Sequence, residues 1–262
     1  MWDRSNCTQA REVVTRGLSS SSLLWSSLHQ QAYRSAGSPI EGQVWPGLGT
    51  GSVLPLSTGS EASLKRLRAW LTECIGKHST CESKSIGLPR RVVDIGPASD
   101  SLNNVRLYES QGDNAPYVCL SYRWSNTANG RLLQANIEQF RTSIRLSALS
   151  ETFFQAFVVA RALGVRYVWI DALCIIQDDD SEKAKDISTM DLIYQSALLK
   201  VMSAWSTEQV FSSPSDVYQH QELEIPFEHP GHAEERVFVR RSIPHFFHDD
   251  EAKKSLPIMN RA

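Results

Sequence analysis

The chain has 262 residues, a formal net charge of −2 at pH 7 and an apolar fraction of 41%, so it is long enough for one large domain or two small ones. The balanced charge gives no support to a nucleic-acid partner or an anionic membrane surface, and five scattered cysteines do not suggest a secreted disulfide framework. Because no stretch approaches the roughly 18 apolar residues of a spanning helix and no secretory signal opens the chain, we expect a cytoplasmic protein without a membrane span.

The N-terminal quarter divides into a loose segment and a helix. Residues 1–60 are expected to be poorly structured, because serine-rich and glycine-rich runs occur at 19–22 and 47–51. A helix is predicted over Glu61–Lys77, because apolar residues recur there at helical spacing. The apolar positions are Leu64, Leu67, Leu71 and Ile75.

Short strand candidates follow this helix. Arg91–Ile95 and Val105–Glu109 lie on either side of a turn-like segment, and they predict a hairpin that leads to the next strand. Helix and hairpin together form a lead-in, residues 61–112, to a main domain at 113–262. A last strand candidate, Arg236–Arg240, lies near the C-terminus.

Three short apolar runs dominate the main domain. The runs are Tyr117–Tyr122, Arg166–Ile170 and Leu198–Met202. Between them, helices are predicted from a cap at Ser150 to Leu163 and from a cap at Ser181 to Gln195. Strand–helix–strand order indicates an α/β fold with a mainly parallel sheet, flanking helices and right-handed crossovers.

Polar and aromatic residues follow the first two runs, at the carboxyl ends of strands, where open α/β sheets bind ligands. They predict a candidate pocket formed by Ser121, Arg123, Trp124, Asp171, Cys174, Gln177 and Asp178. Asp171 could accept hydrogen bonds from a ribose or a catalytic water, or it could cap a turn. Arg123 could hold a phosphate and Trp124 could stack on a base, or Trp124 could cover the sheet end.

Three other chemical patterns have simpler explanations. Cys174 has no histidine near it in the sequence, so a packed core thiol is favoured over a nucleophile. The acidic loop Gln177–Asp180 fits the start of a helix better than a cation site. Cys74, His78 and Cys81 supply three ligands where a structural zinc needs four, so no metal site is predicted.

Several blocks resemble the fungal heterokaryon incompatibility (HET) domain, in the right order and over roughly residues 65–262. Tyr117–Trp124 resembles the opening block, and Leu163–Asp179 is a near-complete copy of the central block. Met190, Ile193, Tyr194 and Ala197 match the helix that follows. Four positions differ from the usual residues: Ser125 for Gly, Gln155 for Asp, Lys183 for Trp and Asp186 for Glu.

The resemblance implies a fold and two alternative functions. HET domains are similar to TIR domains, so a flavodoxin-like sheet is expected. The implied role is a non-self recognition effector that promotes programmed cell death through a protein partner or self-association. The alternative is NAD cleavage, with NAD as substrate and no resident cofactor.

The chain stops at Ala262, where the family's Arg-Ala-Trp-x-x-Gln-Glu block would begin, so the domain is expected to be incomplete there. Its catalytic residues are unknown, and the chain itself is expected to have no catalytic activity.

Overall fold

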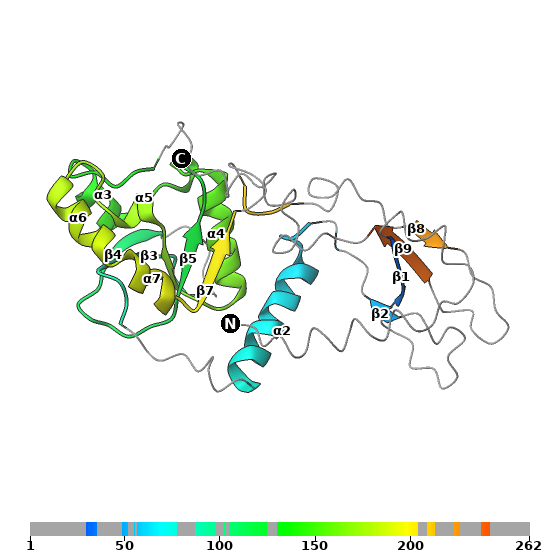
Figure 1. The fold of residues 1–262 in the computed structure, drawn as a ribbon. Helices are drawn as coiled ribbons and strands as arrows, with labels where there is room; N and C mark the ends of the chain where they lie inside the picture. The colour runs from blue at the N-terminus through cyan, green and yellow to red at the C-terminus, as the bar shows by residue number, and fades with distance from the viewer. Residues whose placement is uncertain are drawn as a thin grey trace. The chain divides into compact units, whose positions relative to one another are not determined.

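In the residues that it describes, the computed structural model has sixteen helices and strands, and the chain divides into two compact units (Figure 1). It describes residues 30–35, 49–51, 55, 57–77, 87–97, 102, 105–124, 130–203, 209–212, 223–225 and 237–241. The first unit comprises residues 1–54 and 214–245, and the second comprises 55–213 and 246–262. The predicted domain boundaries stay a prediction.

The first unit holds a four-stranded sheet in the order β2-β1-β9-β8. Its strands are β1 (Gln30–Ser35), β2 (Gly49–Gly51), β8 (Leu223–Ile225) and β9 (Val237–Arg241). The β9 strand confirms the candidate predicted near the C-terminus, whereas β1 and β2 lie in the segment expected to be poorly structured. Because β1 pairs with β9, about two hundred residues away, no local pattern could reveal this sheet.

The second unit is built on a five-stranded sheet in the order β4-β3-β6-β5-β7. Its strands are β3 (Arg91–Asp94), β4 (Arg106–Glu109), β5 (Tyr117–Ser121), β6 (Tyr167–Trp169) and β7 (Leu199–Met202). The β5 strand pairs in parallel with β6 and β7. The β3–β4 hairpin was predicted, but β3 pairs antiparallel with β6. The sheet is therefore mixed rather than mainly parallel.

Helices cover both faces of the sheet around β5, which explains why four of its five residues are buried. On one face, α4 (Glu151–Ala162) brings Phe153 against Tyr122, with ring centroids 5.1 Å apart. On the other, α7 (Met190–Ser196) approaches Tyr117, whose hydroxyl donates a 2.6 Å hydrogen bond to the Ile193 carbonyl. Figure 1 shows the two helices on opposite sides of β5.

Two helices begin and end close to their predicted positions. The α2 helix spans Glu61–Lys77 and packs beside α4. Leu64 and Leu67 lie against the core, but Ile75 at the other end of the predicted apolar face is 38% exposed. The α4 helix begins after Ser150, although the Ser150 side chain makes no capping hydrogen bond.

The helix predicted from Ser181 to Gln195 is two helices in the structure. They are α6 (Asp180–Ser188) and α7, and they meet at Thr189. The hydroxyls of Ser188 and Thr189 donate to the carbonyls of Lys185 and Asp186, at 2.7 and 3.0 Å. Hydroxyl groups that bond to the preceding turn in this way compete with the helix and help to explain its end. The cap of α6 is Asp179, not Ser181.

Three short segments complete the second unit. These are α3 (Ile137–Thr142), the 3-10 helix η3 (Leu146–Ala148) and α5 (Asp171–Cys174). Because α5 starts two residues after β6, it places Asp171 directly at the carboxyl end of the sheet. None of the helices in the described part of the chain has the length and apolar character needed to cross a bilayer.

Candidate functional site

A hydrogen-bonded cluster lies where β5 and β6 end, and Asp171 is at its centre. The indole nitrogen Nε1 of Trp124 donates to Oδ2 of Asp171 at 2.8 Å, and the backbone N–H of Ala172 donates to Oδ1 at 2.7 Å. The side chain of Tyr122 also hydrogen-bonds to Asp171. The structure thus joins two predicted site residues, Trp124 and Asp171, with a third that was not predicted.

Tyr122 links this cluster to the core. Its ring lies nearly parallel to that of Trp124, with centroids 6.5 Å apart, and meets Phe153 of α4 edge-on. Burial, followed by the charge and hydrogen bond of Asp171, raises the pKa of Tyr122 far above its usual value. The hydroxyl therefore stays protonated and acts as a donor to the carboxylate.

Arg131 lies above the same indole, and no sequence pattern predicted it as a site residue. Its guanidinium carbon is 5.2 Å from the centre of the Trp124 ring, within range of a cation–π contact. The chain on either side is held in place: Leu132 N–H donates to the Ala172 carbonyl at 2.8 Å, and Gln177 N–H donates to the Leu132 carbonyl at 2.9 Å. Arg131 is thus fixed beside the segment that carries Asp171.

Cys174 is 2% exposed, and its thiol belongs to the core. Burial raises its pKa to about 12, so the thiolate that a nucleophile requires is scarce at neutral pH. Its carbonyl accepts a 2.8 Å hydrogen bond from Nε of the buried Arg91, whose guanidinium also pairs with Asp186 of α6. These contacts support the interpretation of Cys174 as a packed thiol.

The acidic loop organises helices. Asp178 accepts from the backbone N–H of Gln134 at 2.9 Å. Asp179 accepts from the Glu182 N–H at 3.0 Å and from the Gln134 side chain at 2.9 Å. The hydrogen bond from Glu182 N–H lowers the pKa of Asp179, and this effect outweighs burial, which acts in the opposite direction. The side chain of Gln177 donates to the Asp171 carbonyl at 3.1 Å and stiffens the turn below the cluster.

The remaining predicted residues lie at the edges of this cluster. The Ser121 carbonyl accepts a 2.9 Å hydrogen bond from Ser203 N–H, which joins the ends of β5 and β7. Arg123 is exposed. The proposed cysteine–histidine group lies partly outside the described residues, because of its three members only Cys74 is described. Within the described ranges, no three His, Cys, Asp or Glu side chains come together as metal ligands.

Gln155 stands at a position where the resemblance to HET domains leads one to expect aspartate, and its contacts show how glutamine fits there. It is 6% exposed, and its Oε1 accepts from the backbone N–H groups of Val210 and Phe211, at 2.7 and 2.8 Å. Its Nε2 donates to Glu151 at 2.9 Å. An aspartate is shorter and has no N–H to donate to Glu151, so the glutamine adds a contact within α4.

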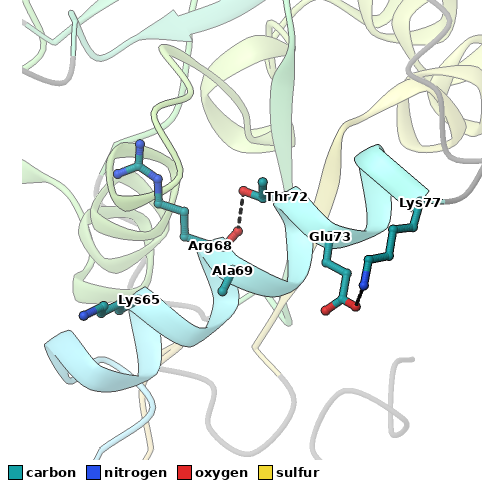
Figure 2. Close-up of a pocket in the computed structure, with 6 residues that line it drawn as sticks. All are labelled: Lys65, Arg68, Ala69, Thr72, Glu73 and Lys77. Carbon is teal, nitrogen blue, oxygen red and sulfur yellow. Dashed lines mark hydrogen bonds and ion pairs between the residues drawn. The ribbon is translucent and has the colours of Figure 1, made fainter.

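Two hollows lined by described residues lie away from the cluster. One runs along α2, where Lys65, Arg68, Ala69, Thr72, Glu73 and Lys77 line it (Figure 2). Figure 2 shows these side chains along the helix, with Lys77 bonded to Glu73 at 2.7 Å. The other is lined by residues of β4 and by Arg141. Neither includes any of the seven predicted pocket residues.

The comparison with protein families settles the family. Residues 117–255, just over half of the chain, match the family described as Heterokaryon incompatibility protein (HET). The chain belongs to the HET family. Searches of curated proteins and of solved structures found no match. The matched HET region begins at the first residue of β5 and includes Trp124, Arg131 and Asp171.

Proposed function

We propose that this HET protein is an effector of fungal non-self recognition that acts in the cytoplasm and promotes programmed cell death when it is activated. The family match over residues 117–255 carries this proposal, because heterokaryon incompatibility is what the family is described by. Activation occurs through association with a protein partner or with further copies of the chain.

The chemistry of the cluster supports action by association. Both Asp171 oxygens accept hydrogen bonds, from Trp124 and Ala172, and Tyr122 bonds to the same carboxylate. A carboxylate engaged in this way positions its neighbours and is poorly placed to act as a general base.

Large apolar side chains are instead exposed on the helices: Ile187 of α6 is 49% exposed and Leu192 of α7 is 54% exposed. Exposed apolar side chains are suited to protein contacts.

Inducible expression in a filamentous fungus tests the proposal. Wild-type protein is expected to reduce viability, and Leu192→Asp is expected to abolish both killing and self-association measured by light scattering. Gln195→Asp is the matched control, because it adds the same charge at an exposed position of the same helix. Equal killing by Leu192→Asp and wild type would exclude this helix face, and no killing by wild type would remove the effector proposal.

A second candidate, an NAD-cleaving enzyme, is favoured by the strand order. The chain enters the parallel part of the sheet at β5, crosses to β6 and returns to the other side of β5 at β7. This order begins a flavodoxin-like sheet of the kind found in TIR domains, with its reversal point between the ends of β5 and β7. NAD would be a substrate there, not a resident cofactor.

The two candidates separate in one experiment. Purified chain, fused to a dimerising tag, is incubated with NAD, and the remaining NAD is measured by chromatography. An enzyme consumes NAD, and an association module leaves it unchanged. Asp171→Ala sharpens the result: if it abolishes killing while folding and self-association are unchanged, the enzyme is favoured.

A further inference from the structure

Arg131 differs from three other arginines around the sheet in the partners it has. Arg91 pairs with Asp186, Arg166 with Asp94, and Arg141 with Glu109. Arg131 is partly buried, yet no carboxylate of the described residues lies within ion-pair distance of it. A guanidinium held away from water normally has such a partner.

One hydrogen-bond donor of Arg131 is also unused. Its Nε is buried and has no hydrogen-bond acceptor among the described residues. The Trp124 ring gives the positive charge a favourable neighbour but supplies no lone pair to the N–H groups. A buried donor without an acceptor costs free energy, so a native one calls for an explanation.

Asp171, the carboxylate of the same cluster, does not fill this role. Its two oxygens accept hydrogen bonds from Trp124 and Ala172. Trp124 thus lies between the carboxylate and the guanidinium: it donates its N–H to one and presents its ring to the other. In this geometry the two charges form no ion pair, and the Nε of Arg131 is left without an acceptor in the described part of the chain.

The position of Arg131 narrows the kind of anion. Leu132, the next residue, is hydrogen-bonded to the segment after β6, at the carboxyl end of parallel strands, where α/β proteins hold ligand phosphates. The planar fork of a guanidinium matches two phosphate oxygens. We propose that Arg131 binds the phosphate group of a small phosphorylated molecule at this edge of the sheet.

Titration calorimetry on the full chain tests the site, with pyrophosphate and ADP as separate probes at low ionic strength. Arg131→Gln is expected to weaken the binding of both probes by about tenfold or more, the usual scale for a hydrogen bond to a charged group. Arg141→Gln is the matched control, because it removes the same charge from an arginine already paired with Glu109. It should change affinity less than about twofold.

The outcomes separate the sources of the phosphate and the roles of the side chain. Tighter binding of ADP than of pyrophosphate identifies a nucleotide, and equal binding identifies bare phosphate; both support the site. No binding to wild type, or equal weakening by the two Gln variants, overturns it. If near-ultraviolet circular dichroism shows that Arg131→Gln misfolds, Arg131→Lys decides. It keeps the charge and loses the fork, so unchanged affinity would contradict the proposal.

This inference concerns binding and does not depend on cell killing or on NAD cleavage. A chain that binds pyrophosphate through Arg131 but neither kills nor consumes NAD would leave it standing. A chain that kills but binds neither probe would remove it and leave the effector proposal intact.

Discussion

The two ends of strand β6 place aspartate and arginine in different relationships. At its start, Arg166 donates two hydrogen bonds to Asp94 of β3, at 2.7 and 2.8 Å, and the charges neutralise each other. At its far end, Asp171 is bound by Trp124 and Ala172 while Arg131 lies on the indole ring. The first arrangement pairs the two charges and joins β6 to β3. The second leaves the Nε of Arg131 without an acceptor among the described residues, and we expect that end to serve recognition more than stability.

The largest effect is expected at the paired end. Asp94→Asn should lower the free energy of unfolding by about 2–3 kcal/mol, because the carboxylate is nearly buried and its bidentate partner would be left uncompensated. The value lies below that of a fully buried pair, since the Arg166 side chain is 46% exposed. Urea unfolding at pH 7 measures it. As a control, Asp113→Asn at an exposed position should cost about 0.5 kcal/mol. Equal losses of unfolding free energy in the two variants would show that the Asp94–Arg166 ion pair does not stabilise the fold.

The Asp94–Arg166 pair also predicts how the stability of the fold depends on pH. Burial by itself would raise the pKa of Asp94, but hydrogen bonds from Arg166 and Gly96 N–H, with the charges of Arg166 and Arg106, bring it below its usual value. A carboxyl whose folded pKa is lowered stabilises the fold above its unfolded pKa of about 3.9. The stabilisation is lost as pH falls through the lower folded value.

Unfolding curves of wild type and Asp94→Asn between pH 7 and pH 2 check this. The difference in unfolding free energy should be constant above about pH 5 and should shrink below about pH 4. A difference that persists unchanged to pH 2 would mean that the loss comes from packing and not from the charge.

Local patterns in the sequence predict the elements but not the ion pair. The Glu61–Lys77 helix and the β5 strand follow from apolar spacing within one segment, and the structure has both. Asp94 and Arg166 are 72 residues apart and meet only because β3 pairs with β6. Since that pairing is antiparallel and non-local, neither the mixed sheet nor its main ion pair could be predicted from periodicity.

Two residues of the candidate site could be predicted from the sequence, and a third could not. Trp124 and Asp171 each follow an apolar run, so the rule on strand ends selected both, and the structure joins them by a 2.8 Å hydrogen bond. Arg131 follows no strand and has no motif around it. It enters the cluster because backbone bonds tie Leu132 to Ala172 and Gln177, contacts that no spacing in the sequence encodes.

At the recognition end, Asp171→Asn should have a smaller effect on stability than Asp94→Asn. The amide keeps one oxygen acceptor but turns the other towards the donors as an NH₂ group, so one hydrogen bond of about 1 kcal/mol is lost. Urea unfolding measures this, with Asp191→Asn at an exposed position of α7 as control. A loss as large as that of Asp94→Asn would show that both ends of β6 serve stability equally.

The smallest effect is expected for Trp124→Phe. Trp124 is 40% exposed, and phenylalanine keeps an aromatic face for Arg131 and Tyr122 while it removes the N–H that bonds to Asp171. The loss should be about 0.5–1 kcal/mol, the value of one hydrogen bond in a partly solvated place. Trp70→Phe, at a 63% exposed position of α2, controls for the change in ring size and should be nearly neutral. A separate consequence distinguishes positioning from packing. Without the indole N–H, Asp171 loses one donor and can pair with Arg131, so pyrophosphate affinity should fall although Arg131 is intact. Unchanged affinity would mean that the Trp124–Asp171 bond does not hold the two charges apart.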